Sequence, residues 1–165
     1  MYHTNINNSD NEIFQKFTES VSYDRNLFKQ DIKGSIAHAK MLAKQNIIST
    51  DDADKICSGL YQIEKEIINN KFIWKYELED IHMNIESRLQ ELIGDIAGKL
   101  HTARSRNDQI ALDMRLFLKE TIVDTIKLLL ELQSTIIARA EENLDVIIPG
   151  YTHMQRAQPL LLSHH

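Results

Sequence analysis

The fold is decided by residues 107–146, which read NDQIALDMRLFLKETIVDTIKLLLELQSTIIARAEENLDV. No proline or glycine interrupts this stretch, and its apolar residues recur at three- and four-residue steps, so it predicts one long α-helix. At 1.5 Å per residue, such a helix would be roughly 60 Å long. Apolar side chains lie on several of its faces, among them Ile110, Met114, Phe117, Leu128 and Leu132. We therefore expect a helix bundle in which neighbouring helices, or partner subunits, cover it.

Shorter helices are expected ahead of this one. Apolar spacing predicts helices over residues 27–46, 49–67 and 80–93, and the polar starts at Ser49 and Asp80 are typical of helix N-termini. Residues 71–79 predict an irregular connection that could hold a short strand, and the asparagine-rich residues 1–10 predict a tail.

No alternating strand pattern is sustained, so the sequence predicts an all-α fold. We expect residues 1–104 to form a small N-terminal helical domain. Residues 105–165 would then begin the long-helix bundle domain.

Composition excludes several classes of protein. The net charge of −5, without a long basic run, argues against nucleic acid as the main partner. No apolar run approaches the roughly 18 residues that a membrane helix needs, and the N-terminus lacks the pattern of a signal peptide. The single cysteine, Cys57, fits a reducing compartment. A cytoplasmic globular protein is expected.

Residues 99–108, KLHTARSRND, concentrate polar side chains just before the long helix. Arg104 and Arg106 are fork-shaped donors suited to carboxylates, although such arginines are more often solvated or in structural ion pairs. Asn107 or Asp108 can cap the helix, which would put residues 105–108 at its positive end, where anions bind. In a net-negative chain, this segment indicates a small acidic metabolite.

Residues 149–159, PGYTHMQRAQP, lie between the only two prolines of the chain. Prolines at both ends favour a rigid connection between helices. Thr152 and His153 put a hydroxyl beside a proton-transfer group, so this loop serves either function or loop packing.

Four motifs together resemble the argininosuccinate lyase/delta-crystallin family of the fumarase/aspartase superfamily. They are HTARSRND at 101–108, GYTHMQRAQP at 150–159, EDIH at 79–82 and SVSYDR at 20–25. The resemblance covers about residues 12–165 and implies the fold of that superfamily's helix bundle. Two departures are Ala103, where the family usually has glycine, and the absence of a Trp-Gly-Gly-Arg-Phe segment ahead of Asn11. The family's signature loop, with its catalytic serine, is expected beyond His165, so this chain would be the N-terminal part of the enzyme and inactive alone.

The resemblance implies a reversible β-elimination, in which argininosuccinate gives arginine and fumarate in arginine biosynthesis. It implies neither a metal nor an organic cofactor, and a homo-oligomer that is a tetramer in full-length members. The alternative is a non-catalytic, delta-crystallin-like structural or assembly protein, because such paralogues can keep many of these motifs.

Site residues are implied by matching motif positions. His153 matches the histidine long assigned as proton acceptor, although the serine of the signature loop is the alternative base. Ser20, Asn107 and Thr152 match substrate contacts. Ser105 and Arg106 would hold a carboxylate, and Asp24 and Asp80 would receive the cationic end of the substrate. His82 matches a second active-site histidine, although in isolation it is more often a capping or surface residue.

Overall fold

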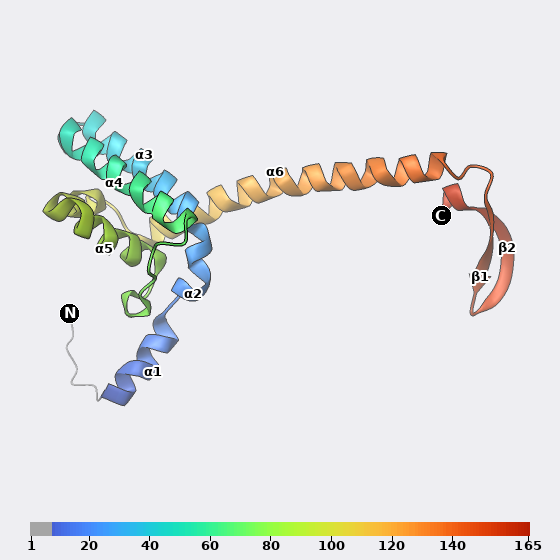
Figure 1. Ribbon diagram of the computed structural model, residues 1–165, viewed down its shortest axis with the longest axis horizontal. Helices are drawn as coiled ribbons and strands as arrows, with labels where there is room; N and C mark the ends of the chain where they lie inside the picture. The colour runs from blue at the N-terminus through green and yellow to red at the C-terminus, as the bar shows by residue number, and fades with distance from the viewer. Residues whose placement is uncertain (1–7) are drawn as a thin grey trace. The chain divides into compact units, whose positions relative to one another are not determined.

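The computed structural model of the chain, drawn in Figure 1, describes residues 8–165, which divide into two units between Phe117 and Leu118. Helices make up most of the secondary structure and contribute most of the core, which confirms the predicted all-α class. Residues 1–7 of the expected tail lie outside the described residues, whereas residues 8–10 belong to a helix. The two units divide inside the long helix, while the domain division proposed from the sequence, at residue 105, precedes that helix.

The first unit consists of short helices and the start of the long one. Its elements are α1 (Asn8–Thr18), α2 (Val21–Asp24), η1 (Arg25–Leu27), α3 (Phe28–Lys44), α4 (Thr50–Ile68), η2 (Tyr76–Leu78), α5 (Ile81–Ile93) and η3 (Gly94–His101), where η marks 3₁₀ turns. The long helix, α6, spans Arg106–Glu141. It begins one residue earlier and ends five residues earlier than the sequence pattern predicted. Within the described residues, segment 71–79 forms the turn η2 and no strand.

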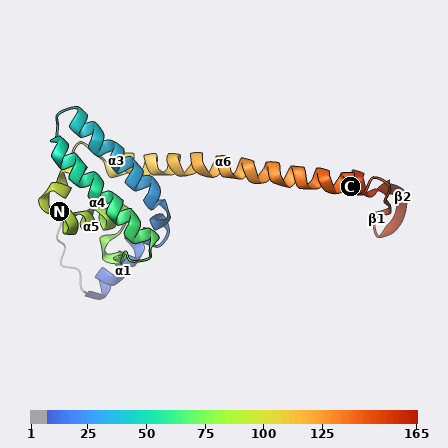
Figure 2. The same ribbon diagram turned by 45° about the horizontal axis from the view of Figure 1, so that its top comes forward.

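The core of the first unit lies among α3, α4 and α5, because α4 packs against both of the others (Figure 2). Its buried side chains are mostly branched aliphatic: Ile32, Ile36, Ala39, Ile56, Cys57, Leu60, Ile63, Ile81, Ile85, Leu89, Ala97 and Leu100. Capping sets the helix starts as predicted. Ser49 Oγ accepts a hydrogen bond from the Asp52 amide at 3.1 Å, and Asp80 Oδ1 accepts one from the Met83 amide at 2.7 Å.

The second unit holds the rest of α6 and a hairpin of β1 (Ile147–Thr152) and β2 (Gln155–Leu161), followed by η4 (Leu162–His164). The prediction of a rigid loop without strands over residues 149–159 is wrong, because β1 and β2 pair there as an antiparallel hairpin. The two turn residues, His153 and Met154, have φ of 48° and 63°, and positive φ at both positions suits a two-residue hairpin turn. The strands alternate too weakly between buried and exposed positions to leave a periodic signal.

Backbone geometry explains how two prolines fit into this hairpin. Pro149 and Pro159 face each other in the register, which shifts between Pro149 and Tyr151. Gly150 lies at that irregularity, where a Cβ would approach the Gln158 carbonyl oxygen to 2.9 Å. The ladder therefore tolerates prolines, which cannot donate, because it is irregular where they pair.

Across residues 8–165, no helix has the combination of length and apolar character that crossing a membrane requires.

Candidate active site

Two of the predicted site residues, Ser20 and Asp24, lie against the N-terminus of α5, which a third, Asp80, caps. The Glu79 carbonyl oxygen accepts hydrogen bonds from the amides of Ser20 at 2.8 Å and Val21 at 3.1 Å. Ser20 Oγ donates to Asp24 Oδ2 at 2.6 Å, and the same oxygen accepts from the Ile81 amide at 3.3 Å. The segment from residue 20 to 24 is thereby tied to the residues that start α5, so the motifs at 20–25 and 79–82 form one surface.

Asp24 is a half-buried carboxyl in this surface. Burial raises its pKa above the ordinary value, against the opposing hydrogen bond from Ser20. Its Oδ1 is buried without a hydrogen-bond partner among the described residues. Asp24 therefore has an unused acceptor that a donor group could satisfy.

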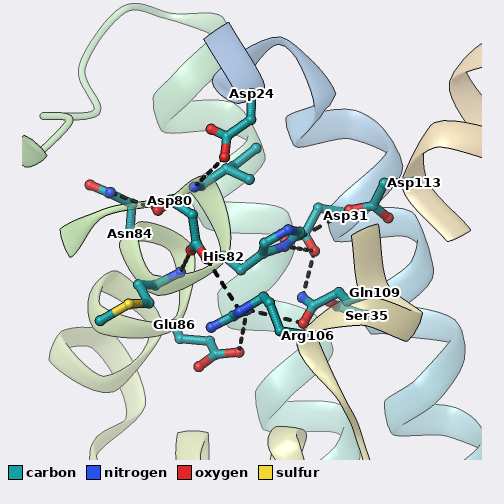
Figure 3. A network of polar contacts seen from close by, with 12 residues as sticks. Asp24, Asp31, Ser35, Asp80, His82, Asn84, Glu86, Arg106, Gln109 and Asp113 are labelled. Atoms are coloured by element: carbon teal, nitrogen blue, oxygen red, sulfur yellow. Dashed lines mark hydrogen bonds and ion pairs between the residues drawn. The ribbon is translucent and has the colours of Figure 1, made fainter. Parts of the chain in front are cut away.

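Arg106, at the first turn of α6, connects this surface to the long helix (Figure 3). Its Nε lies 3.3 Å from Asp80 Oδ2, and its Nη1 lies 3.4 Å from Glu86 Oε1. Nη1 also donates to Gln109 Oε1 at 3.1 Å. Thus Arg106, proposed to hold a substrate carboxylate, pairs here with protein carboxylates, and one of these is the Asp80 proposed for the cationic end.

Arg104 is in a different environment, although it is only two residues away. Its Nη1 donates to Ser35 Oγ on α3 at 2.9 Å, and burial lowers its pKa below the ordinary value. Arg104 therefore joins the loop before α6 to α3.

His82 lies in the interior, 2% exposed, rather than at the surface. Its Nδ1 is 2.9 Å from Asp31 Oδ1 and 3.9 Å from Asp113 Oδ2 (Figure 3). Burial lowers the pKa of His82, but the hydrogen bond and charge of Asp31 outweigh burial, so its pKa is raised overall. The reading of His82 as a surface or capping residue is wrong, because Asp80 is the cap and His82 points inward.

The same three residues form a group that could hold a metal ion. Asp31, His82 and Asp113 are all buried, and each offers one ligand atom, with these atoms within 4.8 Å of one another. Gln109 Nε2 donates to Asp31 Oδ1 at 2.7 Å, so this oxygen already accepts two hydrogen bonds. A cation there would have to displace those donors.

Ser105 and Asn107 flank the start of α6 and are exposed. The helix begins at Arg106, so neither Asn107 nor Asp108 is its cap. The Ser105 carbonyl oxygen instead accepts from the Gln109 amide at 3.2 Å. Residues 105–108 do lie at the N-terminal end of α6, as predicted, where free amides and the helix dipole favour anions.

Thr152 and His153 belong to the second unit, in the exposed turn of the hairpin. Thr152 ends β1, and His153 is the first of the two turn residues with positive φ. Their backbone geometry presents two polar side chains on a tight turn.

Sequence reasoning missed Asp31, Gln109, Asp113 and Glu86. Asp31 and Asp113 lie far apart in the chain, and each belongs to an ordinary helix, Asp31 among polar and charged neighbours and Asp113 among apolar ones. The one available signal was the spacing of Gln109 and Asp113, which puts two polar side chains four residues apart on one face of α6. Close packing brings α3 to that face, since a Cβ on Gly34 would meet Leu112 Cδ2 at 3.0 Å.

Comparison with known proteins identifies relatives along almost the whole chain. A family model described as lyase matches residues 5–165. The argininosuccinate lyase of Sulfurihydrogenibium sp. is 55% identical over 157 residues, 95% of this chain and 34% of that protein. The argininosuccinate lyase of Bacillus cytotoxicus is 52% identical over 151 residues, 92% of this chain and 33% of that protein. The chain thus spans about a third of the length of these relatives.

Solved structures of a lyase share the fold. A double variant of EDDS lyase with bound fumarate matches with a TM-score of 0.68 at 29% identity, covering 84% of this chain and 27% of that one. EDDS lyase in complex with formate matches with the same TM-score, identity and coverage.

Proposed function

The chain belongs to the lyase family, and from that membership we propose that it is the N-terminal part of an argininosuccinate lyase. The carrying observation is that motifs at residues 20–25, 79–82 and 101–108 are joined by the contacts Ser20–Glu79 and Arg106–Asp80. The names of relatives at 52–55% identity support argininosuccinate as the substrate.

The proposed reaction is a reversible β-elimination that releases arginine and fumarate. A base removes the proton beside a carboxylate, charge builds on that carboxylate, and the guanidino nitrogen leaves after protonation. Donors aimed at the developing charge stabilise it. Ser105 and Arg106, at the N-terminal end of α6, suit that carboxylate by charge and position. Asp24, with its unused acceptor oxygen, and Asp80 suit the cationic guanidinium.

Proton transfer is assigned to the hairpin turn. His153 accepts the proton in this proposal, and Thr152 donates a hydrogen bond to substrate. The alternative is that a serine elsewhere in the whole enzyme is the base and His153 relays charge. Ser20 and Asn107 contact substrate, and His82 supports the site from the interior.

Binding of an acidic substrate by an acidic protein requires local cations, and Arg106 supplies one. In the structure it is shared between Asp80 and Glu86. A doubly charged carboxylate substrate would compete for it, and the released Asp80 would become available to the guanidinium. Exchange of ion-pair partners therefore links the two binding roles.

We also propose that the protein is a homo-oligomer, a tetramer in full-length form, and cytoplasmic. Leu128, Leu132 and Ile136 are 65%, 55% and 59% exposed on α6, and such a row of exposed aliphatic residues exceeds what a monomer usually tolerates. Neighbouring copies of α6 would cover it, as in other helix bundles. The single free cysteine is compatible with a reducing compartment.

A chimaera tests the activity. Residues 1–165 replace the aligned third of the Bacillus cytotoxicus enzyme, and fumarate formation from argininosuccinate is followed by ultraviolet absorbance. We expect turnover in the ordinary enzyme range of about 1–10³ per second from the chimaera, and none from the 165-residue chain alone. A folded chimaera without turnover would favour the non-catalytic, delta-crystallin-like alternative.

Light scattering at micromolar concentration tests the assembly. We expect the chain to have a multiple of its 19.1 kDa mass. The double variant Leu128→Glu/Leu132→Glu should dissociate, while Lys127→Glu on the same helix should not. A monomeric wild-type chain would contradict this proposal.

A further inference from the structure

Gln109 occupies the centre of a hydrogen-bonded chain inside the first unit. Its Oε1 accepts from Arg106 Nη1 at 3.1 Å, and its Nε2 donates to Asp31 Oδ1 at 2.7 Å. The same Asp31 oxygen lies 2.9 Å from His82 Nδ1. Figure 3 shows Asp31 between the His82 ring and the Gln109 amide. An uninterrupted path of hydrogen bonds therefore runs from Arg106 to His82 and fixes the Gln109 amide orientation.

Asp113 is the unexplained member of this group. It is fully buried, and neither of its oxygens accepts a hydrogen bond from a donor among the described residues. A second buried carboxyl, that of Asp31, offers an oxygen within 4.8 Å of an Asp113 oxygen. An ionised carboxylate without a donor is expensive to bury. Two neighbouring buried carboxyls avoid this cost when one of them keeps its proton, so that only one of the pair is charged.

The geometry says which carboxyl keeps the proton. Asp31 Oδ1 already accepts from two donors, as a carboxylate does. Asp113 has no such donors, so it is the protonated partner. Burial raises the pKa of Asp113 to about 7, and the charge of Asp31 adds to this, while His82 and Arg104 oppose it. Structure and electrostatics thus agree.

The charges around the cluster come from every element packed on it. They are Asp24 on α2, Asp31 on α3, Asp80 and His82 at the start of α5, Glu86 further along α5, Arg104 before α6, and Arg106 and Asp113 on α6. With Asp113 neutral, the buried carboxylate that lies against His82 Nδ1, at 2.9 Å, is that of Asp31. The Nδ1 atom of His82 then carries a proton toward Asp31, which fixes the orientation of the ring.

We propose that Asp31, Gln109 and Asp113 are positioning residues of the candidate active site. In this buried group Asp113 keeps its proton beside the Asp31 carboxylate. Asp31 and Gln109 then hold the His82 ring and the Arg106 guanidinium in a fixed mutual arrangement. This inference rests on the proposed function only in regarding the neighbouring surface as an active site. Because Gln109 contacts both Arg106 and Asp31, the buried residues fix where the Arg106 guanidinium lies relative to Asp80 and to a substrate carboxylate.

Nuclear magnetic resonance of the 165-residue chain tests the proton positions. Carboxyl-carbon signals labelled in aspartate, assigned with Asp113→Asn, report ionisation, and histidine ring-nitrogen signals, assigned with His82→Gln, report the imidazole. We expect one aspartate to titrate near pH 7, about three pH units above the ordinary 3.8. We expect a proton on His82 Nδ1 throughout that range. Asp113→Asn should abolish the titration and keep the Nδ1 proton, because the amide, like a protonated carboxyl, is neutral beside Asp31.

Gln109→Leu tests the connection to Arg106. We expect the Arg106 Nε–H signal to exchange with solvent at least several-fold faster, with the His82 signals shifted. The matched control is Gln133→Leu, an exposed glutamine of the same helix, which should move neither signal. A merely structural role for Gln109 would alter unfolding without moving these signals selectively.

Three results would overturn the inference. They are an Asp113 carboxyl that titrates in the ordinary range, a His82 ring without a proton on Nδ1, or specific displacement of that proton by added Zn²⁺ or Mg²⁺. The last would assign the three residues to a metal site instead. All readouts are independent of turnover, so an inactive chimaera with these signals intact would contradict the proposed function alone.

Discussion

The two parts of α6 differ in which type of side chain they bury. Near its start, the structure buries only polar side chains of this helix, Gln109 and Asp113, against α3 and α5. Beyond Phe117, in the second unit, aliphatic residues such as Leu128 and Ile136 are more than half exposed. A surface helix of a globular protein ordinarily buries its apolar stripe and exposes its polar one.

Which side chains of α6 are buried therefore depends on the residues that pack against each part of the helix. The first turns face a polar interior, where Asp31 and His82 provide hydrogen-bond partners. The later turns carry apolar residues that require a neighbour of the same kind. We interpret the first part as specialised for a site and the second for assembly.

The largest expected effect is on folding, through Asp31. Asp31→Ala leaves His82 and Gln109 without their acceptor in the interior, so we expect a loss of about 3–5 kcal/mol in the free energy of unfolding. Urea denaturation followed by circular dichroism measures it. Asp124→Ala, which removes an exposed carboxylate of α6, is the control. Equal stabilities for the two variants would remove the contrast between the parts of α6.

The hairpin should show the reverse behaviour, with an effect on turnover and not on stability. In the chimaera, we expect His153→Asn and Thr152→Val each to lower turnover on the order of 10², as the loss of a proton-transfer or hydrogen-bonding group does. Both side chains are exposed, so the melting temperature should be unchanged. Wild-type turnover in both variants would show that the turn is structural.

The third effect is a pH dependence carried by Asp113. Its pKa is raised from 3.8 to about 7, so the folded chain binds more protons there than the unfolded chain between these values. Its contribution to stability is therefore fully present below pH 4 and is lost as pH rises through 7. His82, whose pKa is also raised, acts in the same direction.

Asp113→Asn isolates that contribution, because the amide does not ionise. Between pH 4 and pH 8, we expect the free energy of unfolding of the variant to rise by about 1–3 kcal/mol relative to that of the wild type, allowing for coupling to its neighbours. Thermal unfolding across this range measures the difference. A constant difference would mean that Asp113 is ionised throughout.

The smallest effect is expected from the exposed face of α6. Lys127 pairs with Asp124 at 3.0 Å, with both side chains about two thirds exposed. Such pairs contribute little, so Lys127→Ala should change the free energy of unfolding by less than about 0.5 kcal/mol. A larger loss, measured in the same urea experiment, would mean that this face is covered in solution.

Much of the fold follows from local sequence rules. Apolar spacing gave α3, α4, α5 and the long helix, and the caps at Ser49 and Asp80 fixed two of their starts. The hairpin was not predictable, since its strands are exposed on both sides and a turn at His153 and Met154 requires positive φ in residues that rarely adopt it.

The site divides in the same way. Residue types alone distinguished the polar segments 99–108 and 149–159, which contain Arg106 and His153, because these types suit carboxylates and proton transfer. Ser20 and Asp80 were assigned through the family resemblance. Only the tertiary structure decided that Arg106 shares its charge with Asp80 and Glu86, and that His82 is buried against Asp31 and Asp113. The reason is physical. A carboxyl on an ordinary helix looks like a solvated one until packing removes its water, and only then must it find a partner or keep its proton.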